Sequence, residues 1–100
     1  MVFAKKKWGQ NFLVDNNLLE KIIKTIDISK DDEILEIGPG HGALSEKIIQ
    51  KTKALKMVEI DPELIKVIGQ NPLLSPFEIF NQDILKTNLK ELGLNSPKVI

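Results

Sequence analysis

The stretch from Glu33 to Gly42 constrains the fold of this chain more than any other. It reads EILEI followed by GPGHG, so a short aliphatic run ends in a cluster of glycines. A short apolar run bounded by turn residues is typical of a strand buried on both faces, and a glycine at its end permits the positive φ of a tight turn. The sequence therefore predicts a buried parallel strand over 33–37 and a helix over 43–51.

Strands and helices continue to alternate along the rest of the chain. Apolar runs and turn residues predict further strands over 55–60, 77–80 and 98–100, and helical spacing predicts further helices over 16–27, 62–70 and 88–92. Such alternation is the pattern of a doubly wound α/β sheet. We expect the chain to end as a fourth strand begins.

Polar residues mark where two of these helices begin. Asp15, Asn16 and Asn17 are candidate caps of the first helix, and Asn17 with Glu20 resembles a capping box. Asp61 is suited to cap the helix over 62–70, because the proline that follows it fits a first helical position.

Composition excludes several classes of protein. The 100 residues carry 14 lysines, no arginine and 14 acids, for a net charge of zero, and no apolar run reaches the length of a membrane span. There is no cysteine and only one histidine, His41, so we expect no disulfide, no thiol nucleophile and no metal site. The basic start lacks an apolar segment after it, so no secretory signal is expected. A soluble cytoplasmic domain is the simplest expectation.

Candidate binding residues follow the predicted strands, where ligands of such sheets bind. Gly38 and Gly40 follow the first strand and would let a ligand approach the backbone. Their spacing is G-x-G-x-G, which differs from the dinucleotide pattern G-x-G-x-x-G. Glu59 ends the second strand about 20 residues later, where an acid can accept hydrogen bonds from ribose hydroxyls. Asp61 competes for this role but fits a helix cap better.

The third strand adds a further acid. Asp83 follows it and could accept a hydrogen bond from the exocyclic amine of an adenine, with Ile60 and Ile84 on either side of the ring. A turn-forming aspartate is the alternative explanation. Together with the glycines and Glu59, these residues predict a cleft for a ligand that contains adenosine.

The N-terminal residues Lys5, Lys6 and Lys7 precede Trp8, so cations lie beside a ring that could stack on a base. This segment is a candidate RNA contact, or simply a solvated tail. The balanced net charge and the absence of arginine argue against a module that binds nucleic acid by itself.

Four strings in the sequence together resemble one family. They are GQNFLVD (9–15), EIGPGHGAL (36–44), VEIDPEL (58–64) and NQDIL (81–85). In this order and spacing they resemble the small-subunit (16S) rRNA adenine N6,N6-dimethyltransferases. The resemblance implies a class I, Rossmann-like fold that binds S-adenosyl-L-methionine, and a parent enzyme that methylates adenosines of the immature small ribosomal subunit during ribosome biogenesis.

The resemblance also implies roles for individual residues. Asn11 and Leu13 would cover the methionine end of the cofactor, and residues 1–15 would form this lead, before the first half of the catalytic domain over 16–100. Gly38 would lie under the cofactor, Glu59 would hold the ribose and Asp83 the adenine. The family's catalytic Asn-Leu-Pro-Tyr type motif and its helical RNA-binding domain are expected beyond Ile100. We therefore expect no catalytic residue within the chain, and no activity of the chain alone.

Three alternatives remain at this stage. The antibiotic-resistance methyltransferases of large-subunit rRNA are a sister group, which typically has serine where Gly9 stands. An NAD-dependent oxidoreductase would also use a glycine turn and an acid such as Glu59, although the glycine spacing and the GQNFL string argue against it. A non-enzymatic RNA-binding module that uses residues 5–8 is the third.

Overall fold

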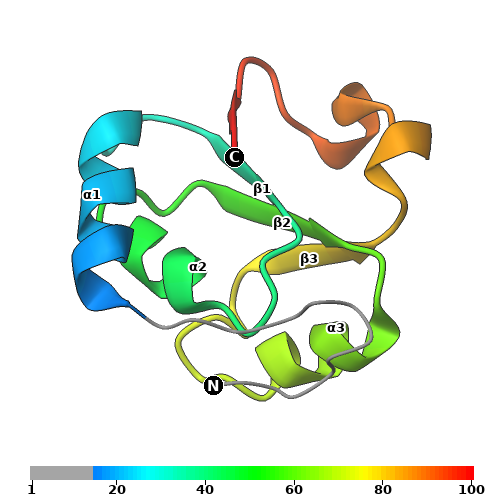
Figure 1. Ribbon diagram of the computed structural model, residues 1–100. Coiled ribbons are helices and arrows are strands. Elements are labelled where there is room, and N and C mark those ends of the chain that lie inside the picture. Colours follow the sequence, from blue (N-terminus) through cyan, green and yellow to red (C-terminus); the bar gives the residue numbers. More distant parts are fainter. Residues whose placement is uncertain (1–14) are drawn as a thin grey trace.

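The computed structural model describes residues 15–100. In chain order the elements are α1 (Asn16–Ile26), β1 (Ile34–Ile37), α2 (Ala43–Ile48), β2 (Leu55–Glu59), α3 (Pro62–Gly69), β3 (Glu78–Asn81), the 3-10 helices η2 (Ile84–Lys86) and η3 (Leu89–Leu92), and β4 (Lys98–Val99) (Figure 1). None of the described helices is long and apolar enough to cross a membrane.

The four strands form one parallel sheet in the order β3-β2-β1-β4. From β1 the chain moves outward through β2 to β3, and it then returns past β1 to add β4 on the other side. The direction of winding therefore reverses beside β1, which makes the carboxyl end of this strand a topological switch point. The carboxyl ends of β1, β2 and β3 all point toward the right in Figure 1.

The sheet is covered on both faces, as its apolar strands require. Ile34 and Met57 pack with residues of α1, α2 and α3 in one core, whereas Leu35 and Val58 pack with Leu92 and its neighbours in a second core. These four strand residues are at most 2% exposed. Two buried faces explain why the neighbouring residues Ile34 and Leu35 of β1 are both apolar. The predicted doubly wound α/β fold is confirmed.

The structure corrects some expected boundaries. The N-cap of α1 is Asp15, whose carboxylate accepts hydrogen bonds from the N–H groups of Asn17 and Leu18 at 3.0 and 3.2 Å. The predicted capping box is therefore wrong, and Glu20 instead forms an ion pair with Lys47 at 2.8 Å. The helix expected over 43–51 ends at Ile48, and the one expected over 88–92 is only a 3-10 helix. The predicted lead over 1–15 lies almost entirely outside the described residues.

Candidate functional site

The glycine turn after β1 leaves its backbone open at the switch point. Gly38 has a φ of +68°, and a Cβ built on it would meet no atom within 4 Å. Its N–H donates to the carbonyl oxygen of Val58 at 2.8 Å, so the turn is held against the end of β2. Gly40 also has a positive φ, of 62°. Open space above Gly38 is what the close approach of a ligand requires.

Gly42 serves a different purpose in the same turn. Its φ is +91°, and a Cβ there would come within 2.4 Å of Leu74 and 3.0 Å of Ile68. Both contact atoms belong to buried core residues. Gly42 is therefore required for packing the start of α2, whereas Gly38 borders open space.

Glu59 lies at the carboxyl end of β2 and is only 6% exposed. Its Oε2 accepts a hydrogen bond from the N–H of Asp61 at 3.1 Å, and within the described part of the chain Oε1 has no partner. The backbone here is fixed, because the carbonyl oxygen of Glu59 accepts from the side-chain amide of Asn81 at 3.0 Å. A held carboxylate with one oxygen available is suited to accept hydrogen bonds from a diol.

The structure separates the two acids that compete for the ribose role. The Oδ1 of Asp61 accepts from the N–H of Glu63 at 2.9 Å, which makes Asp61 the N-cap of α3, with Pro62 in the first turn. The predicted cap is confirmed. Glu59 remains the candidate for ribose.

Asp83 follows β3 and caps η2, since its Oδ1 accepts from the N–H of Leu85 at 2.9 Å. Asp83 therefore does form a turn, as the alternative explanation predicted. The turn uses only one of its two carboxylate oxygens. Asp83 also borders a hollow of about 120 Å³. The residues that line this hollow are Ile37, Gly38, Val58, Glu59, Ile60, Gln82, Asp83 and Ile84.

Five of the predicted binding residues thus share one hollow: Gly38, Glu59, Ile60, Asp83 and Ile84. Gly40 is in the adjoining turn but does not line it. Asn11, Leu13 and the lysines at 5–7 lie outside the described residues. The hollow is smaller than the roughly 300 Å³ or more of a pocket that encloses a drug-sized ligand. It therefore suits part of such a ligand, for example a nucleoside.

The chemistry of the hollow fits the adenosine part of S-adenosylmethionine. The carboxylates of Glu59 and Asp83 supply acceptors for hydroxyl and amine donors. The open space at Gly38 leaves room for the methionine part of the ligand. Ile60 is 64% exposed, so a flat ring laid on it would remove apolar surface from water. Among the described residues no group of three or more metal-ligating side chains is found.

Glu36 is a buried acid just before the glycine turn, and the sequence predictions gave it no role. This carboxyl is 3% exposed in the middle of β1, and its Oε1 accepts a hydrogen bond from the buried hydroxyl of Ser45 at 2.5 Å. The bond joins β1 to α2 across the glycine turn. Burial raises the pKa of Glu36 to about 7, and the Ser45 hydrogen bond opposes this shift only in part. The signal in the sequence that could have pointed to this buried carboxyl was an acid within an otherwise apolar strand.

Comparison with solved structures identifies the class. A dimethyladenosine transferase from Plasmodium falciparum matches 76% of this chain with a TM-score of 0.67 and 30% identity, over 29% of its own length. The 23S rRNA methyltransferase ErmE matches 77% with a TM-score of 0.67 and 29% identity, over 32% of its length. Coclaurine N-methyltransferase, at 22% identity and a TM-score of 0.61 over 72% of this chain and 23% of its own, shares the fold. The fold is that of the S-adenosylmethionine-dependent methyltransferases.

Sequence comparison then identifies the family. The family model described as ribosomal RNA adenine dimethylase matches residues 1–98, and the chain belongs to this family. The ribosomal RNA small subunit methyltransferase A of Malacoplasma penetrans is 43% identical over 91 residues, which are 91% of this chain and 33% of that protein. The protein of the same name from Caldanaerobacter subterraneus is 42% identical over 91 residues, 90% of this chain and 34% of that protein. The chain thus spans about a third of the length of these relatives.

Proposed function

We propose that this chain is the cofactor-binding part of an enzyme that dimethylates adenines of small-subunit rRNA. The observation that carries this proposal is the hollow at the switch point, where Gly38, Glu59 and Asp83 come together from three strand ends. Relatives named ribosomal RNA small subunit methyltransferase A support the choice of RNA. Membership of the family argues against the NAD-dependent oxidoreductase and against a module without enzymatic function.

In this proposal the chain recognises the nucleoside of S-adenosylmethionine, which supplies an activated methyl group. Glu59 accepts hydrogen bonds from the ribose hydroxyls, and the second oxygen of Asp83 accepts one from the adenine amine. Ile60 and Ile84 enclose the ring. The backbone at Gly38, with Gly40 in the same turn, borders the rest of the cofactor. Asn11 and Leu13 cover its methionine end.

The contacts to RNA complete the proposal. We assign Lys5, Lys6 and Lys7 to the phosphates of the immature small ribosomal subunit. The groups that hold the target adenine against the methyl group belong, by resemblance, to an Asn-Leu-Pro-Tyr type motif outside these 100 residues. Because methyl transfer depends on positioning the two reactants, the chain by itself should transfer no methyl groups.

Calorimetric titration tests cofactor binding. We expect the chain to bind S-adenosylhomocysteine and not NAD. Glu59→Ala should weaken binding by about 10²-fold, because charge-assisted hydrogen bonds contribute roughly 1.5–3 kcal/mol each. Asp61→Ala is the matched control: it removes a neighbouring acid and should lower stability by about 1 kcal/mol through loss of the cap. Unchanged affinity in Glu59→Ala would refute the ribose assignment.

A chimera tests the reaction. In it, residues 1–98 replace the matching third of the Malacoplasma penetrans methyltransferase, and transfer of tritiated methyl groups is measured on small and large ribosomal subunits that lack the modification. We expect transfer to small subunits by the chimera and none by the chain alone. Transfer only to large subunits would favour the antibiotic-resistance type instead. Transfer by the chain alone would show that the catalytic groups lie within it.

A further inference from the structure

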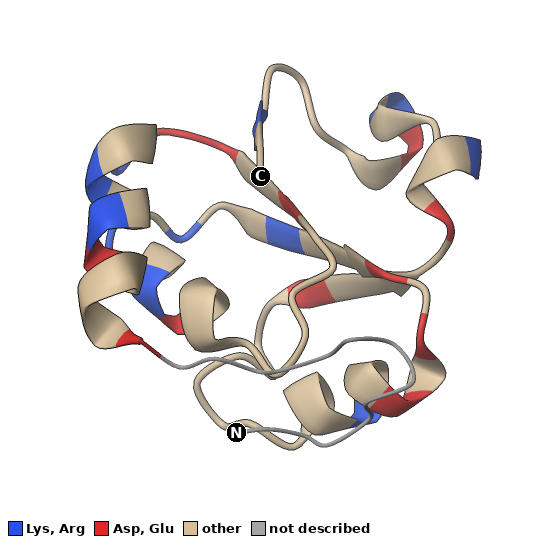
Figure 2. Cartoon of the chain, in the orientation of Figure 1, with Lys and Arg blue, Asp and Glu red and all other residues tan. Residues whose placement is uncertain are grey.

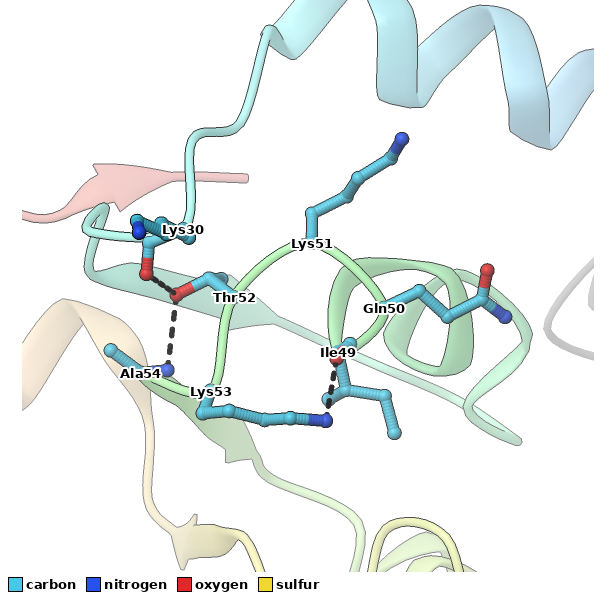
Figure 3. Close-up of a pocket in the computed structure, with 7 residues that line it drawn as sticks. All are labelled: Lys30, Ile49, Gln50, Lys51, Thr52, Lys53 and Ala54. Atoms are coloured by element: carbon cyan, nitrogen blue, oxygen red, sulfur yellow. Dashed lines mark hydrogen bonds between the residues drawn. The ribbon is translucent and has the colours of Figure 1, made fainter.

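A second hollow lies at the amino ends of the strands, opposite the candidate site at their carboxyl ends. It has a volume of about 490 Å³ and is lined by Lys30, which precedes β1, and by residues 49–54, which connect α2 to β2 (Figure 3). Both segments enter the amino ends of their strands. The hollow of the candidate site, which we call the cofactor hollow, is by contrast formed where the strands end. The two hollows therefore lie at opposite ends of the strands of one parallel sheet.

Three lysines border this second hollow and define what we call the amino-edge lysines: Lys30, Lys51 and Lys53. All three are exposed. The ammonium of Lys53 reaches back to the carbonyl oxygen of Ile49 at 3.1 Å, while Lys51 extends away from the turn (Figure 3). A lysine with three donors that makes one backbone contact still has donors for an anion.

A buried hydroxyl holds the two lysine-bearing segments together. Thr52 is 3% exposed, and its Oγ1 donates toward the carbonyl oxygens of Asp32 at 2.8 Å and Lys30 at 3.2 Å. The same oxygen accepts from the N–H of Ala54 at 3.2 Å. These contacts fix the backbone on which Lys30, Lys51 and Lys53 stand. The lysines are therefore presented from a defined frame, and less entropy is lost when they bind together.

The residues that line this hollow include three lysines and no acid, which favours a polyanion. Figure 2 shows lysines on α1, on α2 and before β2 on the left, together with acids in the segment between α1 and β1, and it shows the acids that follow β2 and β3 on the right. The two half-buried acids that follow Asp31 are already engaged. Asp32 pairs with Lys98 at 3.1 Å, and Glu33 accepts the N–H groups of Asn95 and Ser96 at 3.0 Å each. Asp27 and Asp31 are the exposed acids between α1 and β1, and neither of them lines the hollow.

Further lysines extend the surface over the helices. Glu20 of α1 pairs with Lys47 of α2, and its pKa is lowered first by this contact and then by the charges of Lys51 and Lys24. One exposed carboxylate therefore lies among three lysines. The positive surface continues from the hollow across the pair of helices.

We propose that the amino-edge lysines bind the phosphate backbone of RNA, as a contact separate from the one that presents the target adenine. The proposal rests on the proposed function for its choice of RNA as the polyanion. A large structured RNA can contact both edges of a domain this small, and lysines without base-reading partners suit phosphates rather than sequence.

The test measures RNA binding by the chain with two charge-matched triple variants. One is Lys30→Gln, Lys51→Gln and Lys53→Gln. The other is Lys66→Gln, Lys86→Gln and Lys90→Gln, which removes three exposed lysines elsewhere. A fluorescently labelled duplex hairpin of small-subunit rRNA is titrated at a series of salt concentrations, and circular dichroism verifies the fold of each variant.

We expect the amino-edge variant to lose about 10- to 100-fold in affinity near physiological salt, and its salt dependence to weaken by about 2 to 3 in the slope of log K against log salt. The control variant should lose much less. Equal losses in both variants would overturn the proposal by showing an effect of net charge only. Unchanged affinity, or no RNA binding by the unmodified chain, would also overturn it and would leave an acidic protein surface as the partner to test.

The same proteins are titrated with S-adenosylhomocysteine, which should bind all of them equally. If neither the unmodified chain nor the two variants bind S-adenosylhomocysteine, this result would contradict the proposed function but not the RNA contact. The two failures are therefore distinguishable.

Discussion

Replacement of Glu36 by glutamine should change how the stability of this chain depends on pH. The carboxyl is 3% exposed, and burial raises its pKa from 4.5 to about 7. The folded state thus binds this proton more tightly than the unfolded state does. Between the two pKa values the unfolded chain has lost the proton and the folded chain retains it, so the free energy of unfolding falls as pH rises.

The magnitude follows from the shift. One pKa unit corresponds to about 1.36 kcal/mol, so the shift implies a loss on the order of 3 kcal/mol between about pH 4.5 and pH 7. This is a large part of the stability of a small domain. Glutamine has nearly the same shape, can still accept the Ser45 hydrogen bond and never ionises. Glu36→Gln should therefore lack this loss.

Urea unfolding followed by circular dichroism at intervals from pH 4.5 to pH 8 measures the effect. The two proteins should have similar stability at the acidic end, and Glu36→Gln should become progressively more stable relative to the parent as pH rises. Glu20 and Asp32, whose pKa values are lowered by Lys47 and by the Ser29 N–H, oppose the trend because they lose stabilisation at low pH. They are present in both proteins and cancel in the difference. A difference that does not vary with pH would refute the reasoning, and Glu63→Gln provides the same change on an exposed side chain.

Three further predictions concern the site and its frame. Gly42→Ala should lower stability by about 2–4 kcal/mol in chemical denaturation, since it adds a clash with Leu74 to a left-handed φ. Gly38→Ala should instead weaken S-adenosylhomocysteine binding in calorimetry more than it lowers stability. The reverse ranking of the two variants would show that the two glycines are assigned wrongly. Asp83→Asn should retain more of that affinity than Asp83→Ala because the amide oxygen still accepts one hydrogen bond; equal losses, or equal binding of adenosyl- and inosylhomocysteine by the parent, would contradict the adenine contact. Thr52→Val should lower the free energy of unfolding by about 1–3 kcal/mol because a buried hydroxyl with three partners is lost, and thermal melting at unchanged temperature would contradict this.

The sequence was sufficient to predict the features of the fold that depend on local pattern. The aliphatic run before Gly38 predicted β1, and Asp61 before a proline predicted the cap of α3. The grouping of Glu59 and Asp83 followed from one rule, because the ends of parallel strands share an edge. Their roles in binding stay predictions.

Features that depend on distant residues were not predictable in this way. The Glu36–Ser45 bond requires knowing that α2 returns over β1, and the demand for glycine at position 42 comes from Leu74, which is far along the chain. Asp15 was one of three candidate caps of α1, and the sequence could not select among them because several polar residues in a row offer the same chemistry. Main-chain geometry selects Asp15, which is extended at φ −109°.

The position of β2 explains how one small sheet can serve both proposed contacts. Its amino end follows Lys53 in the hollow bordered by the amino-edge lysines, and its carboxyl end is Glu59 in the cofactor hollow. Four steps of about 3.3 Å from Leu55 to Glu59 separate the two ends by roughly 13 Å. This exceeds the Debye length of about 8 Å at physiological salt, so phosphates held at one edge repel the acids of the other edge only weakly. A parallel sheet thus allows an acidic nucleoside site and a basic phosphate surface to coexist, because its strands keep them at opposite ends.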